Sequence, residues 1–212
     1  MKTNKSTCRK LLLAAISISL FNIGVFAKEK SPDGNSTLEN LMTSYNGESN
    51  AHARYISFAQ KADEEGYKEA ASLFRATARA EQVHIKNDAN VAKELGTTLN
   101  ANIETPEVKS TRENLEAAIK GETYESKEMY PAFEKRAKKD GIKSAKTEFG
   151  LAKEAEAVHA KLYKEQLDNI EKGKTELKQF YVCPRCGNIV DKKGKGFCPI
   201  CGEPLANFIP VS

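Results

Sequence analysis

Two copies of a Glu-x-x-His unit stand out in a chain that has three histidines in all. The first is "AEQVH", which holds Glu81 and His84, and the second is "AEAVH", which holds Glu156 and His159. On an α-helix, residues three apart project from the same side, so each unit can direct a carboxylate and an imidazole at one point. Such mixed donor sets favour iron or manganese. The two units therefore predict two halves of a metal site.

The elements that must position these units are long helices. Four segments, at about residues 36–66, 67–95, 111–141 and 142–171, carry apolar residues every three or four positions. Between the second and third, "TTLNANIETPEVKS" predicts a connection across the bundle, and Pro131 predicts a kink at Tyr130. The pattern favours a mainly α protein built on a four-helix bundle.

Charged residues interrupt all four apolar stripes midway. Besides the two units, Glu48 lies on the first stripe, and Glu122 and Glu125 lie on the third, which continues to Met129 and Phe133. An unpaired buried carboxylate loses several kcal/mol of hydration, so five carboxylates with two imidazoles call for two divalent cations. The alternative, charged units that face water by chance, leaves the four interruptions unexplained. His52 has no second donor beside it and is interpreted as a supporting or partly exposed histidine.

The C-terminal stretch holds Cys-x-x-Cys twice, with ligand candidates Cys183, Cys186, Cys198 and Cys201. This spacing predicts two knuckles around a four-sulfur site for zinc or a single iron ion. About 33 residues cannot hold a fold by apolar burial alone, so the metal would also be structural. Two disulfides are the alternative.

The first 27 residues resemble an export signal. Four basic residues precede the apolar run "LLLAAISISLFNIGVF", and Val25-Phe26-Ala27 predicts cleavage after Ala27, followed by a linker at 28–36. An uncleaved membrane anchor is the alternative. Cleavage removes Cys8 and leaves 29 basic against 29 acidic residues, so the mature chain offers no basic patch that would indicate nucleic-acid binding.

Together, these motifs resemble the rubrerythrin family. The matching stretches are "NGESNAHARY", "RAEQVH", "LEAAIKGETYESKEMYPAF", "AKEAEAVHAKLY" and the tail "YVCPRCG…FCPICG", within residues 37–212. The resemblance implies a ferritin-like di-iron four-helix bundle at 37–173, followed by a small rubredoxin-like metal-knuckle β domain at 179–212.

The resemblance also implies roles for individual residues. His84 would compete with Glu125 for one iron as the redox state changes, whereas His159 would be a constant ligand. Tyr55 and Tyr130 match tyrosines that hydrogen-bond near the centre. The implied ligands are Glu48, Glu81, His84, Glu122, Glu125, Glu156 and His159 for two non-haem irons, and Cys183, Cys186, Cys198 and Cys201 for one iron in a tetrathiolate site.

The implied activity is reduction of hydrogen peroxide to water, in defence against oxidative stress, with electrons drawn indirectly from NADH. The implied partners are an electron-donor protein or reductase and a second copy of the chain, paired head-to-tail so that each cysteine domain serves the neighbouring bundle. The leader adds an expected periplasmic location, without membrane association once it is cleaved. The alternatives are a ferroxidase or iron-storage protein, which needs no electron inlet, and a helical module with a structural zinc ribbon, which leaves the buried glutamates unexplained.

Overall fold

The computed structural model describes residues 35–170 and 176–212. The leader expected at 1–27, most of the linker at 28–36 and the expected end of the bundle at 173 lie outside the described residues. Within the described part, no helix is both long and apolar enough to cross a membrane.

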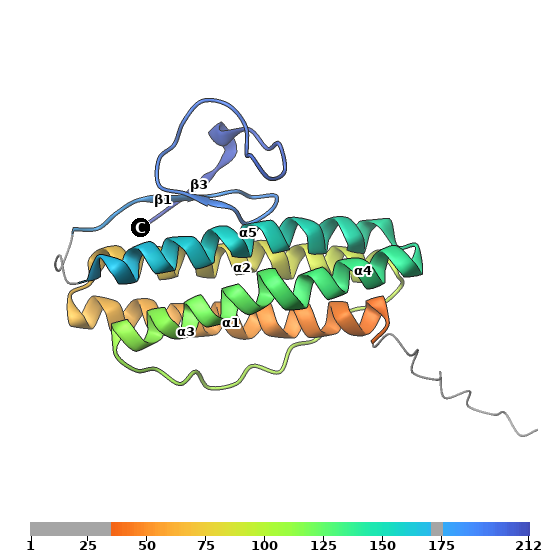
Figure 1. Ribbon diagram of the computed structural model, residues 1–212, viewed down its shortest axis with the longest axis horizontal. Helices are drawn as coiled ribbons and strands as arrows, with labels where there is room; N and C mark the ends of the chain where they lie inside the picture. Colours follow the sequence, from red (N-terminus) through yellow and green to blue (C-terminus); the bar gives the residue numbers. More distant parts are fainter. Residues whose placement is uncertain (1–34, 171–175) are drawn as a thin grey trace, which may run out of the picture. The chain divides into compact units, whose positions relative to one another are not determined.

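Long helices run side by side through the larger part of the chain (Figure 1). They are α1 (Thr37–Glu65), α2 (Lys68–Glu94), the run of α3 (Thr111–Tyr124), η1 (Glu125–Met129) and α4 (Tyr130–Asp140), and α5 (Lys143–Asp168). Ser36 caps α1 in a capping box with Glu39, and Ser110 caps α3 in the same way with Glu113. Gly66 and Gly141 end their helices in the left-handed conformation, which glycine adopts without steric cost.

The kink expected at Tyr130 takes the form of a π-turn just before it. In η1, the Tyr130 N–H donates to the Glu125 carbonyl, five residues back. Pro131 has no N–H to donate, so the normal α-helical ladder is broken here and a wider turn replaces it. The extra residue shifts the buried face: Tyr130 and Ala137 are buried, whereas Phe133, expected on the stripe, is only partly buried.

The connection between α2 and α3 runs along the bundle and lets these two helices run in the same direction (Figure 1). Side chains of α1 hold it in place. Asn46 Oδ1 accepts from the Asn102 N–H at 2.8 Å, and the Asn50 side chain bonds both the Asn102 carbonyl and the Glu104 N–H. The predicted crossover is confirmed.

Two apolar clusters fill the bundle on either side of its polar middle. One is built around the rings of Tyr55, Phe58, Phe74 and Tyr163, and the other contains Leu41, Met129, Tyr130 and Phe149. On each helix the candidate ligands lie between residues of the two clusters, so apolar packing encloses the charged residues from both ends.

The C-terminal part is a small antiparallel sheet with two cysteine loops. Its strands are β1 (Phe180–Val182), β2 (Ile189–Val190) and β3 (Ile209–Val211), in the order β2-β1-β3, and the short helix η3 (Leu205–Asn207) precedes β3. Phe180, Val182 and Ile189 join the apolar cluster that α2 lines. The cysteine domain therefore packs on the bundle of its own chain.

Candidate metal centres

Six of the seven predicted bundle ligands converge in the middle of the helices. Their donor atoms fall into two groups, one of Glu48, Glu81, His84 and Glu156, the other of Glu81, Glu122, Glu156 and His159. Within each group the donor atoms lie within 4.8 Å of one another. Because Glu81 and Glu156 belong to both groups, they are placed to bridge two cations.

Glu156 presents one oxygen to each histidine. Its Oε1 lies 2.8 Å from His84 Nδ1, and its Oε2 lies 2.6 Å from His159 Nδ1. Glu81 Oε2 is 3.2 Å from His84 Nδ1, and Glu122 Oε2 is 3.4 Å from His159 Nδ1. The two Glu-x-x-His units thus face each other from α2 and α5 as two half-sites.

The donor atoms are buried without the partners that buried polar atoms require. Within the described residues, His84 Nδ1, His159 Nδ1 and both Glu156 oxygens are inaccessible and make no hydrogen bond of acceptable geometry, although they lie at ion-pair distances. Such atoms are costly unless a cation coordinates them. The donor set and its unsatisfied atoms therefore fit a pair of metal ions.

The electrostatics of the cluster favour positive charge. Burial, followed by the charge of Glu156, raises the pKa of Glu122 to about 8. Burial by itself favours neutral imidazoles, but the negative charge of Glu156 outweighs it and raises the pKa of both His84 and His159. A field that draws protons onto these groups also attracts a metal cation.

Two backbone carbonyls of the first cysteine loop orient the histidines. His84 Nε2 lies 3.1 Å from the Cys186 carbonyl oxygen, and His159 Nε2 lies 3.0 Å from that of Gly187. A carbonyl only accepts, so both Nε2 atoms carry a proton, and each Nδ1 is left as the ring atom available to a metal ion. Hydrogen bonds of this kind fix the tautomer of a metal-binding histidine.

The two predicted tyrosines contact opposite ends of the cluster. Tyr55 donates a short hydrogen bond to Glu122 Oε1, and Tyr130 donates one to Glu48 Oε1. Each hydroxyl leaves the second oxygen of its carboxylate free to face the centre.

Glu125 and His52 lie apart from both donor groups. Glu125, at the start of η1, is half-buried, and its pKa is raised by burial and then by Glu48, against the opposing charge of Arg54. His52 is partly buried between α1 and α2, where its Nδ1 contacts the Ala78 carbonyl at 2.8 Å. The structure thus has His84 within the donor set and Glu125 outside it, one of the two arrangements that the resemblance implies.

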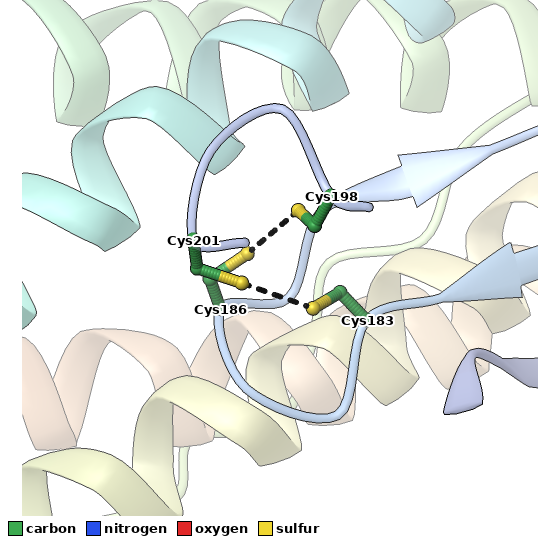
Figure 2. A group of neighbouring side chains, drawn as sticks. All are labelled: Cys183, Cys186, Cys198 and Cys201. Carbon is green, nitrogen blue, oxygen red and sulfur yellow. Dashed lines mark hydrogen bonds between the residues drawn. The ribbon is translucent and has the colours of Figure 1, made fainter. Parts of the chain in front are cut away.

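The four cysteines form the second centre (Figure 2). All four are free thiols, so the alternative of two disulfides is wrong. Cys183 Sγ lies 3.5 Å from Cys201 Sγ, and Cys186 Sγ lies 3.6 Å from Cys198 Sγ. A tetrahedral site with metal–sulfur bonds of about 2.3 Å has sulfurs about 3.8 Å apart. The sulfurs therefore lie nearly where one metal ion needs them.

Local hydrogen bonds favour a thiolate at this centre. The Cys186 thiol, together with the backbone N–H groups of Arg185 and Cys186, lowers the pKa of Cys183 to about 5. Asn188 Nδ2 lies 3.7 Å from Cys198 Sγ. Hydrogen bonds to sulfur tune the reduction potential of a bound iron.

The two centres adjoin within one chain. The residues that carry the histidine-binding carbonyls, Cys186 and Gly187, are a cysteine ligand candidate and its neighbour. The cysteine domain thus contacts the bundle of its own chain. The resemblance led us to expect this contact between neighbouring subunits. Residues 171–175, which join the two parts, lie outside the described residues.

Three residues around the centres were not predicted from the sequence. Ser44 and Asp88 are buried beside the Glu48 end of the cluster, and Gly187 lies against His84. Asp88 falls four residues after His84 on the same stripe, which was the available signal for it. Nothing in the local sequence marks Ser44, because its contact partners lie on other helices.

The bundle with its paired half-sites, followed by a four-thiolate domain, defines a ferritin-like di-iron protein with a rubredoxin-like domain. The rubrerythrin family model matches residues 39–167. Nigerythrin from Nitratidesulfovibrio vulgaris is 39% identical over 190 residues, covering 88% of this chain and 92% of that protein. Rubrerythrin from Porphyromonas gingivalis is 34% identical over 187 residues, covering 86% and 93%.

Solved structures agree with these relatives. A mixed-valence form of nigerythrin superposes with a TM-score of 0.78 at 35% identity, covering 94% of this chain and all of that one. The chain belongs to the rubrerythrin family. Its cofactors are two non-haem irons for the bundle and one iron for the cysteine site, in agreement with the two donor sets.

Proposed function

We propose that this protein is a peroxidase that reduces hydrogen peroxide to two waters, using electrons that enter through the cysteine site. The observation that carries the proposal is the direct contact of the Cys186 and Gly187 carbonyls with His84 and His159. A ferroxidase or storage site has no need of a thiolate centre in hydrogen-bond contact with its ligands, because the Fe(II) that it oxidises supplies the electrons. The family's oxidoreductase character supports the same conclusion.

The residues proposed to hold the two bundle irons are Glu48, Glu81, His84, Glu122, Glu156 and His159, with Glu125 as the alternate ligand to His84. The bound irons would supply two electrons and act as Lewis acids toward both peroxide oxygens. The reaction H2O2 + 2 e⁻ + 2 H⁺ → 2 H2O balances without release of a radical.

The protein's own contribution is enclosure and positioning. The six converging side chains are at most 1% exposed, so the centre admits only a small molecule such as peroxide. Tyr55 and Tyr130 hold the outer oxygens of Glu122 and Glu48, which keeps these carboxylates aimed at the centre. Their hydroxyl groups can also supply protons, since each is already hydrogen-bonded to a carboxylate of the cluster.

The Cys186–His84 contact gives an electron a short covalent and hydrogen-bonded route between the two centres. We propose a separate donor protein or reductase for the cysteine site, linked to NADH through electron carriers, and a homodimer as the assembled form. If the leader at 1–27 directs export, the donor must be periplasmic. Detection of the mature protein in a periplasmic fraction, with Lys28 as its first residue, tests that location.

Iron analysis with an optical spectrum tests the function. Anaerobically purified protein should hold about three irons per chain, two for a di-iron bundle and one for a tetrathiolate. It should show thiolate-to-iron charge transfer that reductant bleaches and peroxide restores. A colourless protein that holds only zinc would exclude redox function, and accumulation of an iron core from added Fe(II) would favour storage instead.

A further inference from the structure

A line of buried side chains leads from the metal cluster to Asp88, a residue with no part in holding metal. Asp88 Oδ2 lies 2.5 Å from Ser44 Oγ, and Ser44 Oγ lies 3.0 Å from the Tyr130 hydroxyl. Tyr130 then donates to Glu48 Oε1. The four residues come from α2, α1, α4 and α1, and each is at most 1% exposed. The helices therefore enclose a continuous hydrogen-bonded path in a water-poor interior.

The chemistry of each member suits proton transfer. The hydroxyls of Ser44 and Tyr130 can each accept one hydrogen bond and donate another, whereas a carboxyl donates only while it is protonated. With the proton on Asp88, every hydrogen bond can point toward Glu48: Asp88 donates to Ser44, Ser44 to Tyr130, and Tyr130 to the carboxylate. If each hydrogen moves across to its acceptor, the direction of all three hydrogen bonds reverses. One proton is thereby transferred from the Asp88 end of the path to the Glu48 end.

The surroundings keep a proton on Asp88. The titratable groups that face it are Glu48 from α1, Tyr130 from α4, Glu148 from α5 and His84 from its own helix. Burial raises the pKa of Asp88 well above its usual value, and the charges of Glu148 and Glu48 add to this against the Ser44 hydrogen bond and His84. The geometry requires the same proton: three hydrogen bonds join the four groups, the hydroxyls of Ser44 and Tyr130 supply two hydrogens, and Asp88 is the carboxyl outside the donor set that can supply the third.

We infer that Asp88 is the proton donor of the di-iron site, and that it acts through the hydroxyls of Ser44 and Tyr130, which reach the Glu48 end of the centre. The inference rests on the proposed peroxidase function, in which each peroxide consumes two protons inside a closed bundle. One proton leaves Asp88 as the carboxyl O–H bond breaks, the hydroxyls of Ser44 and Tyr130 each accept one proton and release another, and the last proton forms an O–H bond of a product water. No electron moves along this path.

The charge of Glu148 acts on Asp88, and Glu148 itself reaches the surface of the protein. It is 7% exposed and lines a surface cavity of about 390 Å³ together with Asn87 and Arg185. Asn87 Nδ2 donates to Glu148 Oε1 at 3.1 Å, and burial raises the pKa of Glu148 to about 7. This cavity, lined by Glu148 and by Asn87, the chain neighbour of Asp88, is where protons from solvent can return to the buried acid.

Rapid mixing of the fully reduced, iron-loaded protein with peroxide tests the path. Asp88→Asn and Ser44→Ala should each slow oxidation of the bundle by about 10- to 100-fold, the lower range of general acid–base contributions. Ser44→Thr, which keeps the hydroxyl, should restore most of the rate. Ser72→Ala is the matched control, because Ser72 is equally buried but bonds only to the Lys68 carbonyl of its own helix.

Two further readouts separate proton delivery from a structural role. Infrared spectra of the resting iron-loaded protein should contain the carbonyl stretch of a buried protonated carboxyl group, which Asp88→Asn removes and Ser72→Ala keeps. The oxidation rate of Asp88→Asn should also fall as pH rises, because its protons then come from solution, whereas wild type should change little.

The outcomes distinguish this inference from the function on which it rests. If wild type reacts with peroxide and Asp88→Asn, with normal iron content, reacts equally fast at every pH, the path is wrong and the peroxidase stands. A slow Ser44→Thr as well as Ser44→Ala would also overturn the path, since it would indicate a packing defect. If wild type itself is not oxidised by peroxide, the proposed function fails, and the path fails with it.

Discussion

The two metal centres of this protein are built in opposite ways. The four cysteines lie between residues 183 and 201 on two tight loops, and their geometry is set by local turns. The bundle donors come from helices that are far apart in sequence, between Glu48 and His159, and only long-range packing brings them together. A metal site on loops can be predicted from the spacing of its ligands in the sequence. A metal site in a bundle also depends on which helix faces pack against one another.

The largest expected effect is on peroxide turnover, when the bundle centre is removed and the cysteine centre is kept. Replacing both Glu81 and Glu156 with Ala removes the two carboxylates shared by both donor groups. Peroxide turnover should fall by about a thousand-fold or more, because each donor group loses two of its four members. The visible thiolate band should remain. Turnover assays with optical spectra check this, and Glu154→Ala, which is exposed on the same helix, is the control.

The converse change removes the cysteine centre. Cys198→Ser should abolish the thiolate band and unfold the small sheet, because metal binding supplies most of the folding free energy of such a domain. Steady-state turnover with a protein donor should stop, whereas a chemically reduced bundle should still react once with peroxide. Iron content and stopped-flow oxidation measure this, with the exposed Lys195→Ala in the same loop as control. Loss of the single turnover too would mean that the centres are not separable.

A smaller effect probes the contact between the centres. In Gly187→Ala, the new Cβ would lie 2.5 Å from His84 Nε2, so the histidine or the loop must shift. Gly202→Ala is the matched control, since Gly202 has the same φ of 76° but nothing within 4 Å of its added Cβ. Both should lose about 1 kcal/mol of stability from the left-handed backbone.

Only Gly187→Ala should disturb the bundle. We expect electron transfer from the reduced cysteine site to slow by about tenfold, as the hydrogen bond that orients His84 is lost. Flash reduction followed by optical recording of the thiolate band measures this rate. Equal rates in the two glycine variants would show that the carbonyl contact has no part in electron entry.

The smallest effect concerns bundle stability away from both centres. Hydrogen bonds from Arg136 and Thr37 lower the pKa of Asp140 from 3.8 to about 2. A depressed pKa stabilises the fold above the unfolded value and loses that contribution as pH falls through the folded value. Because Asp140 is partly exposed, Asp140→Asn should cost about 1 kcal/mol at pH 7.

That cost should shrink between pH 4 and pH 2, where the carboxylate becomes protonated. Urea unfolding of both proteins across this range checks the sign. Asp168→Asn is the control, since Asp168 pairs with Lys164 on an exposed surface and should change little at any pH. A cost that stays constant with pH would assign the effect of Asp140 to packing.

The predictability of the two centres follows from the same contrast. All four cysteines were predicted from two short repeats, because a tetrathiolate site needs little beyond its own turns. The paired Glu-x-x-His units were predicted from helical periodicity, and six of the seven bundle ligands do converge. Glu125 could not be placed, because its position depends on the π-turn that begins there. Ser44 and Asp88 could not be paired, since they meet only when α1 and α2 pack.

The π-turn of η1 determines which side of the α3–η1–α4 run faces the metal cluster on either side of the turn. Glu122 and Tyr130 are eight residues apart, which in an unbroken α-helix places them about 80° apart around the axis. The π-turn accommodates one extra residue, so the directions of Glu122 and Tyr130 around the helix axis are those of residues seven apart. They then differ by only about 20°. The helix thus tolerates one surplus residue without rotating its far half. Deleting Lys127, an exposed residue within η1, should convert this stretch to a regular helix and leave both Glu122 and Tyr130 facing the centre.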